Sequence, residues 1–575
     1  MKAKYFINIV FLVCVFYLKD HLSQTIIPNG SSVNGIWSLS GSPYIIHGNI
    51  DISSLDVLTI EPNVEILFNG NFKLTVFGKL IAEGTQTGPI IFDVVDTTGF
   101  SMPSNVFPPQ NCTWRGIEFL NNSNSQKLIH CFLKHANRNA IIISNCLDVQ
   151  IENSDISSNI GDYSSTIHAA IKVENSEVFI RHNNIHHNER LVGISMQNSS
   201  GIISFNDIHD NNTLNGGAGI SCEDSSNPLI FSNDIHHNSY ASLYDSYQAG
   251  GIFISNSSPE LMSNSIYYNS SFSSGGGVSV VSSNPIMISN LIANNILTAN
   301  EFCGAHDGGA GIYVLNSSLY MQNNIVVNND SRFRGSGVYS RASKLHCFNN
   351  LISNNSSNHP SGGVGLWIQE DDSSIIANTI IYGNEAWDSA GSVLYLTPLS
   401  DINFFETNGT PSHSIINCNI SNYSPQFVNP SLGAGVNYDG FSADWHSYYV
   451  NSNIDGGTIV SSWASLYQAD FDGMQRVQGV NIDIGPFENG DLVTVPKNDN
   501  NLFYNIYPNP TKAKLNVETE KSIESLMLYS IKGELILTKI NEDNTIDLSG
   551  FSKGIYLLKV EFENGKTVAK RVIKN

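Results

Sequence analysis

Short aliphatic runs separated by polar turns repeat through the middle of the chain. A string of the form N-x-I-x-x-N returns at intervals of 23–33 residues. Its central aliphatic positions are Ile156, Ile185, Ile208, Ile235, Ile266, Ile292, Ile325, Leu351 and Ile380. A glycine-rich string such as GGAGI or GSGV follows each of the central copies. A motif of fixed order at a loose period of this length is typical of a solenoid.

The segments between the turns have the chemistry of β-strands. GIFIS, GIYVL and GVSVV are short, rich in Ile and Val, and alternate in polarity. Equivalent strands of successive coils lie ~4.8 Å apart, so we expect the aliphatic positions to form one interior ladder. The repeated asparagines can hydrogen-bond to their counterparts in neighbouring coils. Glycines suit corners that need a positive φ or a close approach. The sequence therefore predicts an all-β parallel β-helix.

The glycine corners and repeated asparagines resemble the pectin-lyase-like right-handed parallel β-helix family of extracellular bacterial proteins. SPYIIHGNIDI and LTIEPNVEILF match the opening segments of that family. DFDGMQRVQGVNIDIGPFE, at 470–488, resembles the closing segment of many Bacteroidota surface proteins. We place this domain, with its cap and closing segment, at 24–490. A period of about 27 residues implies about sixteen or seventeen coils.

The two ends of the chain read as export signals. Residues 1–23 combine two early lysines with an apolar run too short to span a bilayer, which predicts a signal peptide and no transmembrane segment in the mature chain. A polar linker at 491–502 precedes residues 503–575, where YPNP, LNVE and LSGFSKGIYLLKV resemble the type A C-terminal sorting domain of the type IX secretion system. The resemblance implies a small antiparallel β-sandwich, an extracellular or outer-membrane surface location in a Gram-negative bacterium, and the secretion machinery as a partner. Its motif residues are Tyr507, Pro508, Asn509, Pro510, Gly554 and Tyr556.

Charge and cysteine content narrow the partners. Of 29 basic and 51 acidic residues, 15 and 41 fall in the body between the two export segments, giving it a formal charge of −26. Such a body lacks the clustered Lys and Arg that nucleic acid or an anionic membrane requires. Seven of the eight cysteines lie after the predicted signal peptide, and their wide spacing without a CxxC pair argues against a disulfide framework or a zinc site. We expect most of them to be small buried residues.

Variable segments between the asparagine turn and the glycine corner should emerge along one edge of the stack. Loops on a rigid scaffold often carry binding residues. Aromatic side chains stack on sugar rings, and arginines hold carboxylate or sulfate groups. The candidate ligand-binding residues are Tyr244, Tyr247, Glu301, His306, Asp307, Arg332, Phe333, Arg334, Trp387 and Asp388. The alternative is a solvated edge with scattered polar residues.

A second set of residues repeats at the polar turns. His186, His209 and His236 occupy equivalent positions, and each is followed by one further polar residue, His187, Asp210 and His237. Imidazoles and a carboxylate can bind a divalent metal. Aligned polar residues are, however, ordinary on β-helices, so we expect a stacking ladder and no metal.

Two functions remain open. The first is a non-catalytic adhesin or glycan-binding rod, which the regular ladder and the export signals favour. The second is a polysaccharide lyase or glycoside hydrolase acting on acidic polysaccharide. Of the strings of polygalacturonase-like enzymes, the chain has paired aspartates at 371–372 but no GHG or RIK. A lyase would need calcium, and Glu301, Asp307 and Arg332 form such a site only if the fold gathers them. Otherwise we expect no cofactor.

Overall fold

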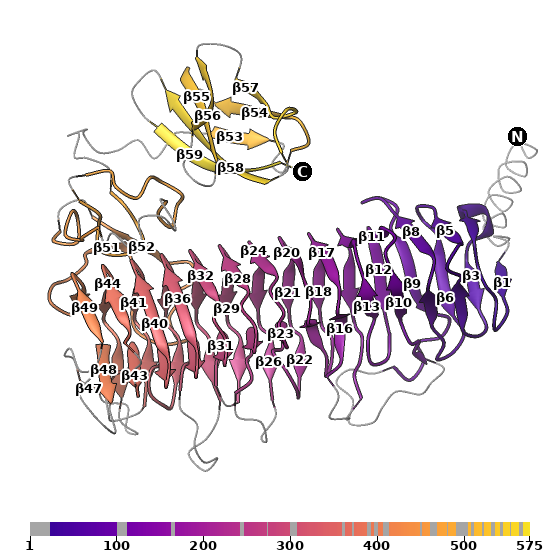
Figure 1. Ribbon diagram of the computed structural model, residues 1–575, viewed down its shortest axis with the longest axis horizontal. Helices are drawn as coiled ribbons and strands as arrows, with labels where there is room; N and C mark the ends of the chain where they lie inside the picture. The colour runs from indigo at the N-terminus through magenta and orange to yellow at the C-terminus, as the bar shows by residue number, and fades with distance from the viewer. Residues whose placement is uncertain are drawn as a thin grey trace, which may run out of the picture.

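The computed structural model describes residues 24–574 except 101–111, 163–166, 242–246, 273, 299–307, 359–362, 371–372, 388–392, 396–400, 406–412, 449–450, 460–468, 480, 490–503, 508–510, 520–521, 531–534, 541–543, 553 and 563–566. The predicted signal peptide, the whole of the predicted linker and the paired aspartates lie outside the described residues. Figure 1 shows a long stack of coils, with the strands of each sheet running side by side across it.

Three long parallel sheets form the body. Sheet A has 15 strands, from β1 (Thr25–Ile27) to β50 (Asn419–Ile420). Sheet B has 13 strands, from β4 (Ile50–Ile52) to β48 (Ile402–Phe405). Sheet C has 14 strands, from β2 (Gly35–Trp37) to β49 (Ser414–Ile416). A shorter sheet D runs from β22 (Asn212–Thr213) to β47 (Val393–Tyr395), between sheets A and B. Successive coils pair strand on strand, which confirms the predicted parallel β-helix.

The interior ladder forms as predicted in the first part of the repeat. Ile185 on β18 (Asn184–His186) pairs with Ile208 on β21 (Asp207–His209). Ile235 on β25 (Asp234–His236) and Ile266 on β29 (Ser265–Tyr267) continue the row. All four side chains are fully buried, and a buried isoleucine contributes about 1.5–3 kcal/mol.

For the last three members of the ladder, the prediction was wrong by one residue. Ile292 on β33 (Leu291–Ala293) pairs with Val326, and the row continues through Ile352 and Ile381. The predicted residues lie one position earlier, on the outer face of β37 (Ile325–Val327), β41 (Leu351–Ser353) and β45 (Ile380–Tyr382). The prediction failed because the outer positions there are also apolar, and alternation no longer marks the inner face.

Asparagine ladders run along the turns on both sides of sheet A. Asn211 Nδ2 donates to Asn238 Oδ1 at 3.0 Å, and Asn238 Nδ2 donates to Asn269 Oδ1 at 3.1 Å. The first asparagines of the motif form a second ladder, in which Asn206 Nδ2 donates to Asn233 Oδ1 at 2.9 Å. These contacts confirm that the repeated amides bond from coil to coil.

A row of glycines marks the corner that leads into sheet B. A Cβ on Gly251 would lie 2.4 Å from the carbonyl oxygen of Gly277, and a Cβ on Gly277 would lie 2.7 Å from that of Gly311. None of these three glycines has a positive φ. Close backbone approach between coils is therefore the reason for glycine here.

The described residues between 423 and 489 leave the coil and fold back over the outer face of sheet A. We call them the closing segment; they include the described part of the predicted 470–488. Asn294 Nδ2 donates to the carbonyl of Tyr438 at 2.7 Å, and Asn349 Nδ2 to that of Asp483 at 2.9 Å. The closing segment also buries the outer apolar residues of sheet A. The shared cluster contains Ala293, Ile325, Val327, Leu351, Ile380, Trp445, Ile484 and Phe487. Because these residues do not form further coils, the predicted number of sixteen or seventeen coils is too high.

The C-terminal part forms two small antiparallel sheets around one core. The first contains β53 (Tyr504–Tyr507), β54 (Lys514–Thr519) and β57 (Thr545–Asp547). The second contains β56 (Leu535–Ile540), β55 (Ile523–Ser530), β58 (Gly554–Phe562) and β59 (Thr567–Lys574). Buried leucines, valines and isoleucines from both sheets share the core, so the predicted sandwich is confirmed.

The motif residues of this domain lie at strand ends. Tyr507 ends β53 and Gly554 begins β58, where its φ is 153°. The hydroxyl of Tyr556 donates to the carbonyl of Ser552 at 2.7 Å, while its ring is buried. Pro508, Asn509 and Pro510 lie outside the described residues.

Two further expectations concern cysteines and membrane spans. Cys131, Cys146, Cys222 and Cys347 are buried free thiols, as expected of small core residues. Burial raises the pKa of the Cys347 thiol to about 12, which keeps it protonated. In the described part of the chain, no helix is long and apolar enough to cross a membrane.

Candidate functional site

An aromatic row lies on the outer face of sheet B. Tyr313 on β35 (Ile312–Leu315) pairs with Tyr339 on β39 (Val338–Arg341), which pairs with Trp367 on β43 (Leu366–Gln369). The two tyrosine rings stack with centroids 5.5 Å apart and planes 3° from parallel. All three side chains are at most 3% exposed, although they point away from the coil interior. The row is therefore a rigid platform beneath the turns that precede each strand.

The turn between β38 (Asp330–Ser331) and β39 carries Arg332, Phe333 and Arg334. Ser331 Oγ accepts from the backbone N–H of Phe333 at 3.1 Å and donates to its carbonyl at 2.8 Å. The guanidinium of Arg334 lies 4.8 Å from the ring centroid of Trp367. Arg332 is exposed, and Phe333 and Arg334 are half-buried. A cation over an indole face is attracted by the ring quadrupole, so this contact holds Arg334 in place.

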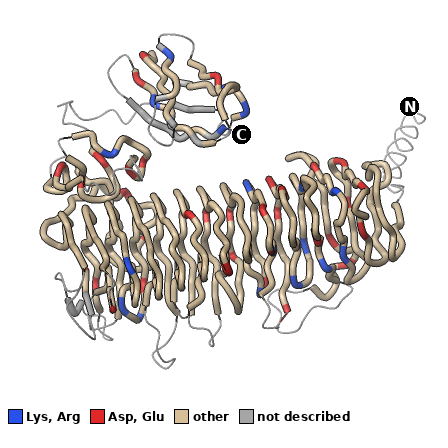
Figure 2. The backbone as a smooth tube through the Cα atoms, in the orientation of Figure 1, with Lys and Arg blue, Asp and Glu red and all other residues tan. Residues whose placement is uncertain are grey.

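Tyr247 reaches the other end of the row. Its ring centroid is 5.9 Å from that of Tyr313, and 39% of the residue is exposed. We call Tyr247, Arg332, Phe333 and Arg334 the arginine edge. Along the coils, Figure 2 shows basic segments mainly near the N-terminal end, with a further group among the later coils. The arginine edge thus combines exposed aromatic surface with two cations on an otherwise acidic body.

The remaining predicted residues do not join the arginine edge in the described structure. Trp387, on β46 (Glu385–Trp387), follows Ala386, which pairs with Ser357 and so lies two coils beyond Ser331. Trp387 itself is half-buried. Five further candidates lie outside the described residues, namely Tyr244, Glu301, His306, Asp307 and Asp388. The calcium site that would need Glu301 and Asp307 stays a prediction for the same reason.

Sequence reasoning missed the platform itself. Tyr313, Tyr339 and Trp367 each stand one position after the first aliphatic residue of the glycine-corner string, in GIYV, GVYS and GLWI. Strand alternation places that position outside the coil. An aromatic residue there in three successive coils was the available signal.

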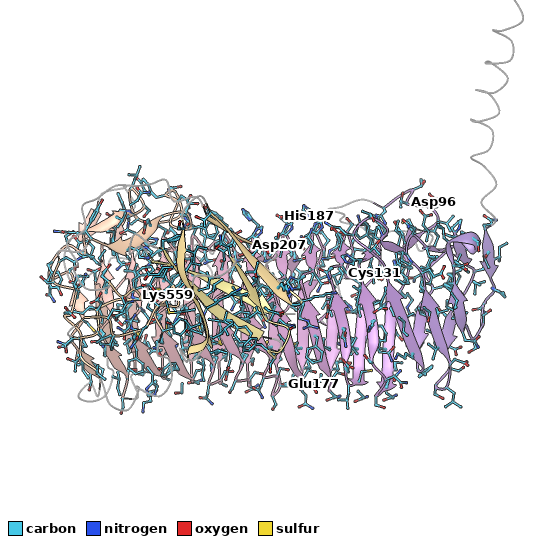
Figure 3. All side chains as sticks on the ribbon, turned by 90° about the horizontal axis from the view of Figure 1, so that it is seen from above. Asp96, Cys131, Glu177, His187, Asp207 and Lys559 are labelled. Carbon is cyan, nitrogen blue, oxygen red and sulfur yellow. The ribbon has the colours of Figure 1, made fainter. Side chains whose placement is uncertain are left out.

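The histidines form the predicted stack on the outer face of sheet A. His186 and His209 have ring centroids 4.8 Å apart, and His209 and His236 have centroids 4.9 Å apart. The two pairs are 7° and 5° from parallel. Tyr267 continues the stack beyond His236 at 4.8 Å. Figure 3 places His187 and Asp207 towards one long edge of the rod and Glu177 on the opposite one.

Comparison with known proteins then separates the two parts of the chain. Residues 115–329 match the family model described as a right handed beta helix region. Residues 505–575 match the secretion system C-terminal sorting domain. This chain is an exported right-handed β-helix protein with a type IX sorting domain. The exported β-helix protein is therefore extracellular or held at the surface of a Bacteroidota cell.

Two further matches are one protein compared by sequence and one solved structure. Beta-agarase D of Zobellia galactanivorans is 34% identical over 68 residues, which are 12% of this chain and 14% of the agarase. The exported β-helix protein thus matches about one-seventh of that relative's length. A crystal structure of a pectate lyase covers 82% of this chain and 98% of its own, with 10% identity and a TM-score of 0.33.

Proposed function

We propose that this exported protein is a non-catalytic adhesin that binds an acidic glycan at the arginine edge. The observation that carries the proposal is the position of Arg334, which is fixed over Trp367 at 4.8 Å while exposed Arg332 stands two residues away on the same turn. One fixed and one exposed guanidinium group, close together, suit carboxylate or sulfate groups spaced along a polymer. Phe333 and Tyr247 add aromatic surface for sugar rings.

Export supports this proposal. An extracellular protein is exposed directly to polysaccharides outside the cell. Its parallel sheets hold the binding turn on a rigid support. The body charge of −26 repels acidic polymers elsewhere. Binding should therefore concentrate where the basic side chains project.

The test is retention of the purified protein on immobilised uronic-acid, sulfated and neutral polysaccharides. We expect retention on at least one acidic polymer and loss of that retention in the double variant Arg332→Ala/Arg334→Ala. The control is Lys79→Ala/Lys127→Ala, which removes the same charge from the N-terminal coils. Unchanged affinity in the arginine variant would overturn the assignment of the edge.

The same samples distinguish the enzyme alternative. Absorbance near 232 nm reports unsaturated product, and a reducing-end assay reports hydrolysis. Burial raises the pKa of Asp330, two residues before Arg332, to about 6. A carboxyl group with a pKa near neutrality is suited to proton transfer. Product that disappears in Asp330→Asn would replace the adhesin proposal with a catalytic one.

A further inference from the structure

The histidine stack has a second set of contacts that stacking alone does not require. Each stacked ring contacts the previous coil through Nε2. His186 Nε2 lies 3.2 Å from Asp155 Oδ2, and His236 Nε2 lies 3.0 Å from Asp207 Oδ1. A carboxylate can only accept, so Nε2 carries the proton in both rings. In the neutral imidazole the lone pair then belongs to Nδ1.

The Nδ1 atoms all face the next residue along the chain. His186 Nδ1 lies 2.7 Å from His187 Nδ1, and His209 Nδ1 lies 2.8 Å from Asp210 Oδ2. His187 and Asp210 both have a φ of 51°, in the left-handed region. The turn therefore directs each of these side chains back over the stacked ring before it. In the metal-free protein these short contacts require a proton between His186 Nδ1 and His187 Nδ1 and a proton on His209 Nδ1, and a bound metal ion would displace both. The arrangement gathers three imidazoles and one carboxylate at one point on the surface.

We propose that His186, His187 and His209, assisted by Asp210, bind one divalent transition-metal ion. The three histidines each offer a ring nitrogen, and these atoms lie within 4.8 Å of one another. Zinc–nitrogen bonds of ~2.0–2.1 Å need ring nitrogens about 3–3.5 Å apart, so small ring rotations complete the site. Imidazole nitrogen favours zinc, copper or nickel over calcium or magnesium.

The surroundings have the features of a metal site. Asp155 behind His186 resembles the carboxylate partner that orients a metal-bound imidazole and raises its basicity. Asp210 is not one of the three residues within 4.8 Å of one another, but its exposed carboxylate lies beside His209 and would turn towards the ion as the fourth ligand. The acidic body attracts cations.

One site per chain is expected in the described part of this surface. His236 and His237 repeat the same contact, with their Nδ1 atoms 2.8 Å apart. The next coil, however, offers Tyr267 and Tyr268 in place of another imidazole. That pair therefore lacks a third nitrogen and provides a matched control.

The experiment uses the purified full-length mature protein without an affinity tag of histidines. After treatment with chelator and buffer exchange, zinc is titrated by calorimetry and the bound metal is counted by elemental analysis. We expect about one zinc per chain and a drop in affinity of at least tenfold in His187→Asn, because loss of a partner that only orients a ligand already costs about 10–100-fold. Asparagine is tolerated at this turn, because Asn294 and Asn328 hold the same left-handed position in later coils. The control His237→Asn should bind zinc like the parent.

A cobalt spectrum provides a second readout. Cobalt bound by three nitrogens and one oxygen in a tetrahedral site should give visible absorption that is lost in His187→Asn and kept in His237→Asn. Matching melting curves would show that both variants fold. Absence of bound metal in the parent, or equal loss in the two variants, would overturn the proposal and leave a stack of rings only.

Discussion

The side chain of Asn238 hydrogen-bonds to both neighbouring coils, and Asn269 is its partner in the asparagine ladder on the next coil. Asn238 Nδ2 donates to Asn269 Oδ1 at 3.1 Å and to the carbonyl of Ile208 at 2.8 Å. Its Oδ1 accepts from the backbone N–H of Asn211 at 3.1 Å. The side chain is fully buried, so no water replaces these partners.

Replacing Asn238 by alanine should lower the free energy of unfolding by about 2–4 kcal/mol. The substitution leaves a buried N–H and a buried carbonyl without partners, and each costs about 1–3 kcal/mol. Chemical denaturation measures the loss. Asn358→Ala, at an exposed asparagine of the same body, should change stability by less than about 0.5 kcal/mol. Equal effects would contradict a structural role for the ladder.

Gly251→Ala should destabilise the coils by about 1–3 kcal/mol, because the new methyl group meets the carbonyl oxygen of Gly277 at 2.4 Å and Cγ2 of Ile266 at 2.9 Å. Thermal unfolding followed by circular dichroism provides the measurement. Gly550→Ala is the control, since a Cβ there meets nothing within 4 Å. An unchanged melting temperature in Gly251→Ala would show that the coils can move apart at this corner without loss of stability.

The closing segment should weaken in alkali through His446. Burial alone lowers the pKa of His446, but hydrogen bonds and charge from Asp472 and Asp444 outweigh it and raise the pKa to about 9. Nε2 lies 2.7 Å from Asp472 Oδ2, and Nδ1 lies 2.6 Å from Asp444 Oδ1. The raised pKa means that this contribution is complete below about pH 6.5 and is lost as the pH rises through 9.

The measurement is the difference in melting temperature between the parent and His446→Gln, taken from pH 6 to pH 10. The difference should be largest at pH 6 and nearly vanish at pH 10. The corresponding difference in the free energy of unfolding should be roughly 1 kcal/mol or less, because the side chain is 40% exposed and solvent screens the pair. A difference independent of pH would contradict the charged state of His446.

Substituting lysine for both Arg332 and Arg334 should separate charge from geometry at the arginine edge. Lysine keeps the positive charge but lacks the planar fork that binds a carboxylate through two hydrogen bonds. For the acidic glycan that the parent protein binds, we expect about a tenfold loss of affinity in the lysine variant and complete loss in the alanine variant. Surface plasmon resonance on the immobilised glycan gives both values. Full affinity in the lysine variant would leave charge as the sole determinant.

Periodicity was enough to predict the coil, because a buried aliphatic position must recur in every turn of a parallel β-helix. It failed at Ile325, where the outer residue is as apolar as the inner Val326. The outer row changes from Asp207 and Asp234 to Leu291 and Ile325 where the closing segment begins to cover it. That change was visible in the sequence, but its cause lies more than 100 residues further along the chain.

The candidate site was predictable only in part. Arg332 and Arg334 stand out because basic residues are scarce in the body. The support of Arg334 by Trp367 comes from a side chain on the next coil, so spacing along the chain does not reveal it. The metal proposal depends likewise on the Nδ1 and Nε2 partners of His186, which only coordinates supply.

The return of the closing segment over sheet A changes how the rod can come apart. Most bonds between coils join residues 23–34 positions apart, so an end coil could fray alone. Asn294, Asn323 and Asn349 instead bond to carbonyls 134–146 positions further on. These coils cannot open separately until the closing segment lifts away, so they form one cooperative block. The coils that carry His186, His209 and His236 lie on the N-terminal side of that block, and they should exchange their amide hydrogens faster than the block does.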